Sequence, residues 1–246
     1  MHTQKRLKTV HKVLLGIVLS MLLLFGSAYL YVSDYYRADG ATENRTLHAD
    51  LHITDTKDAL IVGADHATTA LIFYPGGKVD HRAYEPLMLL IAQQGMLCIV
   101  PKMPFNLAVF DVDVADRFIP LYPEIESWYV GGHSLGGSMA ASYAAKKSDG
   151  LEGVILLASY STADLFYAGL RVLSIYGSKD SVLSKESYQK YGGNLPSNVT
   201  SLVLQGANHA GFGAYGPQKG DGIADISAQE QQAAAAQAIA EFCLVH

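Results

Sequence analysis

The sequence predicts an α/β protein, a three-layer sandwich in which helices cover both faces of a mostly parallel sheet. Short apolar runs, such as residues 71–74 and 153–158, alternate along the chain with amphipathic stretches, such as residues 81–94. The runs are apolar throughout rather than at every second position, so other elements must cover both faces of each strand. The connections are short, and residues 158–172 leave no room for a cap domain.

The expected elements follow in regular order after the strand at 71–74. The chain turns at Pro75-Gly76-Gly77 and enters the helix 81–94, which Gly95 closes. Ser227, with Glu230 three residues later, is the expected capping box of the last helix. Further strands are expected at 97–100, 128–131, 153–158, 172–176 and 201–205, and further helices at 135–147, near 184–192 and at 227–244. Runs at 47–53 and 59–63 add an antiparallel edge, and the gap 101–127 has room for a small helix.

Composition and charge exclude several classes of protein. The chain has 246 residues, of which 50% are hydrophobic and 17% charged, and only 2 are Cys, which excludes a disordered chain or a disulfide-stapled miniprotein. Four of the 18 Lys and Arg residues and none of the 23 acids precede the first hydrophobic segment, so the rest of the chain is strongly acidic. Nucleic acid is therefore excluded as a partner, because its backbone requires clustered Lys and Arg.

Residues 13–32 carry no charge and predict a membrane segment. Twenty residues in a helix span about 30 Å, the thickness of the hydrocarbon core of a bilayer. The basic segment 1–12 before it predicts a cytoplasmic N-terminus, a polar stalk at 33–46 and a single domain at 47–246 outside the cell. A signal peptide cleaved near Ala28, after the small residues Gly26 and Ser27, is the alternative, and the domain would then be secreted.

The residues Gly132-His133-Ser134-Leu135-Gly136 match the pattern G-x-S-x-G between a predicted strand and a predicted helix. In such a sharp turn the backbone of the serine is strained, and its flanking positions need glycine. The turn raises the hydroxyl of Ser134 above the sheet and directs the N–H of Leu135 toward the atom that the hydroxyl attacks. Ser134 is therefore the candidate nucleophile, and the side chain of His133 must point elsewhere.

A serine hydroxyl needs a base, and the base needs a carboxylate that orients it. His209 lies in a glycine-rich loop directly after the last predicted strand and is the candidate base, with His81 as a minor alternative. Asp180 follows the strand 172–176 and is the candidate acid, with Asp164 as its rival. The carboxyl ends of parallel strands meet at one edge of a sheet, where such sites form.

Acyl transfer also requires hydrogen-bond donors for the oxyanion. The N–H of Leu135 is one, and the turn at Pro75-Gly76-Gly77 suggests the N–H of Gly77 as the second. The alternative is that these glycines serve only to reverse the chain.

These motifs together resemble the α/β-hydrolase superfamily over about residues 47–245, and most closely its small, cap-less members related to the dienelactone-hydrolase-like group. The shared features are the Pro-Gly-Gly turn, the Gly-His-Ser-Leu-Gly-Gly sequence at 132–137, Gly-Ser-Lys-Asp at 177–180 and Asn-His at 208–209. The resemblance implies the roles given above for Ser134, Asp180 and His209, and neither a metal nor an organic cofactor. Dienelactone hydrolases proper have Cys at the position of Ser134, and many superfamily members have His at the position of Pro75.

The expected function is hydrolysis of an ester, a thioester or a similar acyl bond in a small-molecule or lipid-like substrate. The same three residues could also transfer the acyl group to another acceptor, which would make the protein an acyltransferase. A third possibility is a catalytically silent binding protein on the same fold.

Overall fold

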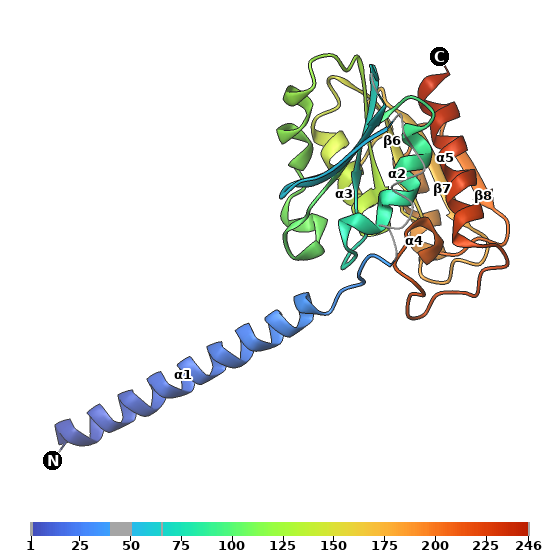
Figure 1. Cartoon of the computed structure of the whole chain (residues 1–246). Coiled ribbons are helices and arrows are strands. Elements are labelled where there is room, and N and C mark those ends of the chain that lie inside the picture. Colours follow the sequence, from blue (N-terminus) through green and yellow to red (C-terminus); the bar gives the residue numbers. More distant parts are fainter. Residues whose placement is uncertain (1, 40–50, 65, 246) are drawn as a thin grey trace. The chain divides into compact units, whose positions relative to one another are not determined.

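The computed structural model describes residues 2–39, 51–64 and 66–245. It divides into two compact units, residues 1–35 and residues 36–246. The first unit contains the helix α1 (His2–Ser33), and the second unit contains the sheet and the other helices (Figure 1).

The helix α1 is apolar along most of its length. Its segment Leu14–Ser33 has a mean hydropathy of 2.1 and is long enough to cross a membrane, and none of it is buried. The helix continues without interruption through Gly26, Ser27 and Ala28, and the hydroxyl of Ser27 donates a hydrogen bond to the carbonyl of Leu24 at 2.9 Å. This apolar helix agrees with the expectation of a membrane anchor or a signal sequence.

Among the described residues, eight strands form one sheet in the order β1-β2-β4-β3-β5-β6-β7-β8. The strands β3 to β8 run parallel, and β1 and β2 form the expected antiparallel edge next to β4. The bounds of the strands are β1 Leu51–Asp55, β2 Ala59–Ala64, β3 Thr69–Tyr74, β4 Leu97–Pro101, β5 Ser127–His133, β6 Leu151–Leu157, β7 Arg171–Gly177 and β8 Thr200–Leu204. The predicted α/β class is confirmed, while residues 47–50 of the expected first strand lie outside the described residues.

The helices of the second unit are α2 (Glu85–Ala92), α3 (Leu135–Lys146), α4 (Lys185–Lys190) and α5 (Ala228–Leu244). A short 3-10 helix, η2 (His81–Tyr84), leads into α2, and the expected capping box of Ser227 and Glu230 is present at the start of α5. The long connection between β4 and β5 contains four 3-10 turns, η3 (Pro104–Asn106), η4 (Ala108–Phe110), η5 (Val114–Arg117) and η6 (Ile119–Leu121), rather than one small helix. A further turn, η8 (Ala210–Phe212), follows β8.

Two apolar cores lie on the two faces of the sheet. Because side chains alternate along a strand, Phe73 joins the core that contains α2 and α5, and the adjacent Ile72 joins the core that contains α3. Both residues of β3 are fully buried. The central strands of the sheet are covered on both faces, as apolar strands such as β3 and β4 require.

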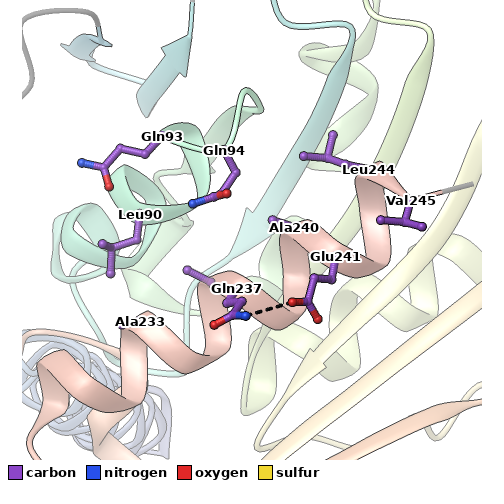
Figure 2. A pocket seen from close by; sticks show the side chains of 10 residues that line it. Leu90, Gln93, Gln94, Ala233, Gln237, Ala240, Glu241, Leu244 and Val245 are labelled. Carbon is purple, nitrogen blue, oxygen red and sulfur yellow. Dashed lines mark hydrogen bonds between the residues drawn. The ribbon is translucent and has the colours of Figure 1, made fainter.

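The helices α2 and α5 lie side by side and enclose a groove of about 490 Å³ (Figure 2). Gln237 and Glu241 of α5 form a hydrogen bond of 2.9 Å at its wall. The groove shares no lining residue with the pocket that contains Ser134. Its walls are mainly Ala, Leu and Gln side chains, none of which provides a nucleophile.

The first residues of the second unit pair with loops of the domain. The N–H of Tyr36 donates to the carbonyl of Lys78 at 2.8 Å, and the N–H of Asp80 donates to the carbonyl of Tyr36 at 2.9 Å. The ring of Tyr36 also lies 5.4 Å from the ring of Tyr215. Of the expected stalk 33–46, residues 36–39 thus belong to the domain unit, and residues 40–46 lie outside the described residues.

Candidate active site

Ser134 stands at the turn between β5 and α3, at the end of the sheet where the parallel strands end. Its backbone has φ 52° and ψ −123°, a conformation that is unfavourable for any residue except glycine. The N–H of Ser134 donates to the carbonyl of Leu157 at 2.9 Å, and the hydroxyl of Ser159 donates to the carbonyl of Ser134 at 2.7 Å. Hydrogen bonds from the next strand and from the loop after it therefore hold the strained turn.

The glycines on either side of Ser134 are required by close backbone contacts. A Cβ atom at Gly132 would lie 2.5 Å from the carbonyl oxygen of Tyr74, and a Cβ atom at Gly136 would overlap the same oxygen. Since β3 passes this close, only glycine fits at either position. This geometry agrees with the expectation of a sharp turn that leaves no room for side chains at the two positions.

His209 and Asp180 form a buried pair. Nδ1 of His209 lies 2.9 Å from Oδ2 of Asp180, and each side chain is only 1% exposed. The other carboxylate oxygen of Asp180 accepts hydrogen bonds from the N–H groups of Val182 at 2.9 Å and Leu183 at 2.8 Å. These bonds fix the carboxylate, which in turn fixes the rotation of the imidazole ring.

Within the described part of the chain, the second ring nitrogen of His209 is not held by a hydrogen bond, and none joins it to the hydroxyl of Ser134. Nε2 is buried and has no hydrogen-bond partner among the residues that the structure describes. His209 and Ser134 both line a pocket of about 250 Å³, together with Tyr160, Val182 and Leu183. Buried nitrogens are rarely left without a partner, and among the described residues Nε2 of His81 and Nε2 of His133 share this state with Nε2 of His209.

Leu135 and Gly77, the two residues whose N–H groups are candidate donors to an oxyanion, lie next to each other. Leu135 is the first residue of α3, where the N–H has no partner within the helix. A Cβ atom at Gly77 would lie 3.0 Å from the side chain of Leu135. We call residues 75–78 the oxyanion loop. Its other N–H groups are engaged, that of Gly76 by the hydroxyl of Tyr84 at 2.9 Å and that of Lys78 by the carbonyl of Asn106 at 2.7 Å.

The alternative candidates have other partners. His81 is buried, with Nδ1 3.3 Å from Oδ1 of Asp80 and Nε2 3.6 Å from Oδ1 of Asp55, and it does not line the pocket that contains Ser134. Asp164 accepts a hydrogen bond from the N–H of Phe166 at 2.9 Å in the loop after β6. Neither residue joins His209 and Ser134.

Asp221 is a structural residue of the site that the sequence did not reveal. Its carboxylate accepts hydrogen bonds from the N–H of Ala210 at 2.8 Å and from the N–H of Ser181 at 3.3 Å. These two residues directly follow His209 and Asp180, so Asp221 joins the loop of His209 to the loop of Asp180. An acid in a glycine-rich loop gives no pattern from which this role could be deduced.

The fold of the domain has counterparts among solved structures. A dienelactone hydrolase from Anabaena variabilis ATCC 29413 matches with a TM-score of 0.58 and 15% identity, over 78% of this chain and 96% of that chain. Est1E from Butyrivibrio proteoclasticus matches with a TM-score of 0.52 and 12% identity, over 79% and 97%. The thioesterase domain from the curacin biosynthetic pathway matches with a TM-score of 0.54 and 11% identity, over 79% and 99%.

Curated protein sequences contain no match to this chain. The family model described as the alpha/beta hydrolase family matches residues 70–233. These residues span the sheet from β3 onward and include Ser134, Asp180 and His209, and the same architecture is found in the solved hydrolases. The chain therefore belongs to the α/β-hydrolase family.

Proposed function

We propose that the chain is a serine hydrolase that cleaves an ester, a thioester or a similar acyl bond through Ser134, His209 and Asp180. The observation that carries the proposal is the state of His209. One of its ring nitrogens is held by Asp180, the other is buried without a partner among the described residues, and His209 lines the same pocket as Ser134. This is the arrangement that a general base for a serine needs.

The reaction would proceed in two halves. Oγ of Ser134 attacks the acyl carbon while its proton passes to Nε2 of His209, and the carbonyl oxygen becomes an oxyanion that accepts hydrogen bonds from the N–H groups of Leu135 and Gly77. The bond to the alcohol or thiol then breaks, and the leaving group takes the proton from His209. Water attacks the resulting acyl-enzyme, gives one proton to His209, releases the acid and restores the hydroxyl of Ser134 as that proton returns.

The comparisons support the class of bond. The similar folds include a dienelactone hydrolase and a thioesterase domain, whose names refer to ester and thioester chemistry. The pocket of about 250 Å³ lies just below the usual volume of pockets for drug-sized ligands, about 300–1,000 Å³, which favours a small acyl group.

Labelling with a fluorophosphonate tests the proposal, because this probe reacts with an activated serine. We expect the full-length protein to be labelled on Ser134 and to hydrolyse p-nitrophenyl acetate. Ser134→Ala should remove both properties, while Ser142→Ala should keep them, because the hydroxyl of Ser142 donates to the carbonyl of Ser138 within α3 at 2.9 Å and Ser142 does not line the pocket that contains Ser134. Equal labelling of wild type and Ser134→Ala would reject the assignment.

The outcome also separates the other functions. Absence of labelling in the folded wild-type protein would favour a silent binding protein. Labelling without release of the free acid, together with acyl transfer to an added alcohol, would favour an acyltransferase.

A further inference from the structure

A buried hydrogen-bonded pair, Tyr84 and His133, lies behind the candidate active site. Tyr84 ends η2 and is fully buried, and His133 is the last residue of β5, directly before Ser134. The hydroxyl oxygen of Tyr84 accepts a hydrogen bond from the N–H of Gly76 at 2.9 Å and lies 2.9 Å from Nδ1 of His133. One phenol therefore contacts both the oxyanion loop and the strand that carries the nucleophile.

The donors and acceptors of this pair determine where its protons lie. The N–H of Gly76 can only donate, so the single hydrogen of the Tyr84 hydroxyl is available for Nδ1 of His133. In this arrangement Nδ1 is the acceptor and the ring proton of a neutral His133 lies on Nε2, which is buried without a hydrogen-bond partner among the described residues. Burial, and next the charge of His209, hold the pKa of His133 well below its usual value, and burial raises the pKa of Tyr84. Both side chains stay uncharged at neutral pH.

Close contacts join the pair to the catalytic groups. A Cβ atom at Gly76 would lie 2.8 Å from the Tyr84 hydroxyl and 2.9 Å from Nδ1 of His133, so the backbone of the oxyanion loop lies directly against both polar atoms. The centroid of the His133 ring lies 4.6 Å from that of His209. Tyr84 and His133 thus both contact Gly76, the neighbour of Gly77. His133 also directly precedes Ser134 in the chain, and its ring packs against the ring of His209.

We propose that Tyr84 and His133 are positioning residues that hold the oxyanion loop in a fixed position relative to Ser134, the proposed nucleophile, and His209, the proposed base. The inference rests on the proposed serine hydrolase function. The pair fixes Gly76, and through the chain it fixes the N–H of Gly77, relative to the turn at Ser134. The neutral ring of His133 also supports the His209 ring without placing a second positive charge beside the imidazolium that forms during the reaction.

Tyr84→Phe removes only the hydroxyl oxygen that joins Gly76 to His133. We expect kcat for p-nitrophenyl acetate to fall about 10-fold, because small displacements of catalytic groups cost up to about 100-fold, while KM stays within about twofold. The rate of fluorophosphonate labelling should fall by a similar factor, since the phosphonyl oxygen also needs the oxyanion donors. Tyr129→Phe is the matched control: Tyr129 is fully buried on the same strand as His133, its hydroxyl donates to the carbonyl of Cys243 at 3.3 Å, and its loss should leave kcat near the wild-type value.

A double-mutant cycle separates positioning from general destabilisation. His133→Leu should lower kcat by a comparable factor, and the variant with both Tyr84→Phe and His133→Leu should be little worse than the weaker single variant, because each change breaks the same connection. Additive losses would overturn the proposal, as would a Tyr84→Phe variant with the wild-type kcat and labelling rate. All measurements are made well below the melting temperature of each variant.

Variants of His133 test the same hydrogen bond from its other end. If Tyr84→Phe does not fold, His133→Asn is compared with His133→Leu, because the amide oxygen of Asn can accept the hydrogen bond of the phenol and Leu cannot. A higher kcat for the Asn variant supports the proposal, and equal values overturn it. Absence of labelling in the wild type would instead reject the proposed function itself, so the two failures are distinguishable.

Discussion

Ser134 has a backbone conformation that costs free energy, with φ 52° and ψ −123°. Strain of this kind amounts to about 1–3 kcal/mol and persists where the surrounding structure enforces it. Here the enforcing contacts are the hydrogen bonds of Ser134 to Leu157 and Ser159 and the approach of Tyr74 to Gly132. The position proposed for the nucleophile is therefore a position of stored strain.

We expect Ser134→Gly to be more stable than Ser134→Ala by about 1 kcal/mol, because glycine adopts a positive φ freely and alanine does not. Melting temperatures and urea unfolding of the two variants measure the difference. The same pair at Ser142, inside α3, is the control: there the Gly variant should be the less stable by about 1 kcal/mol. A Gly variant at 134 that is no more stable than the Ala variant would mean that the turn is not strained.

The residues of the proposed triad could be named from the sequence because each follows a strand directly or within a few residues. Ser134 has a motif, and Asp180 and His209 have their positions after β7 and β8. The partner of His133 could not be named, since its hydrogen bond to Tyr84 joins residues 49 positions apart. Asp221 likewise acts through backbone N–H groups, which carry no mark in a sequence.

At the scale of elements, Asp80 shows how a short turn beside the oxyanion loop is stabilised. Asp80 caps η2, and its carboxylate accepts hydrogen bonds from the N–H of Arg82 at 3.0 Å and from the Arg82 guanidinium at 2.7 Å. Burial raises the pKa of Asp80, but the hydrogen bonds from His81 and Arg82 outweigh this effect and hold the pKa well below its usual value. The ionised carboxylate is thus favoured in the folded state.

This shift has a consequence for stability in acid. A lowered folded-state pKa contributes stability above the unfolded-state pKa of about 4, and the contribution is lost as the pH falls through the folded-state value. We expect Asp80→Asn to lower the free energy of unfolding by about 1 kcal/mol at pH 7, and the difference from wild type to shrink between about pH 5 and pH 2. Urea unfolding across this range measures it.

Asp149→Asn is the control for this experiment, because Asp149 is exposed in the turn before β6. The free energy of unfolding of the Asp149→Asn variant should equal that of the wild type at every pH. A difference between Asp80→Asn and wild type that stays constant down to pH 2 would contradict the role of the carboxylate charge.

At the scale of the whole molecule, the order of strands and helices along the chain could be predicted because central strands such as β3 and β4 are short apolar runs that end at a turn residue, as β3 does before Pro75. Contacts between distant loops could not be predicted in this way. Tyr36 is bonded to Lys78 and Asp80 only through backbone groups, which any residue type provides. Its ring packs on the ring of Tyr215, which is far away in the sequence. The segment that follows α1 thus bonds to the loop that carries Gly77.

We predict that the helix α1 keeps the chain anchored in a membrane and that the chain is not cleaved near Ala28. The apolar segment Leu14–Ser33 continues past Ala28, and the only polar side-chain group between Met21 and Ala28, the hydroxyl of Ser27, is bonded within the helix. We expect the protein in the membrane fraction of its host to resist extraction with alkaline carbonate and to keep residues 1–28, as measured by mass spectrometry of its N-terminus. A variant with Leu22→Arg and Leu23→Arg should no longer be retained, since each arginine at the centre of a membrane helix costs about 2.5–3.5 kcal/mol. A soluble wild-type form that begins just after Ala28 would show that α1 is a signal sequence.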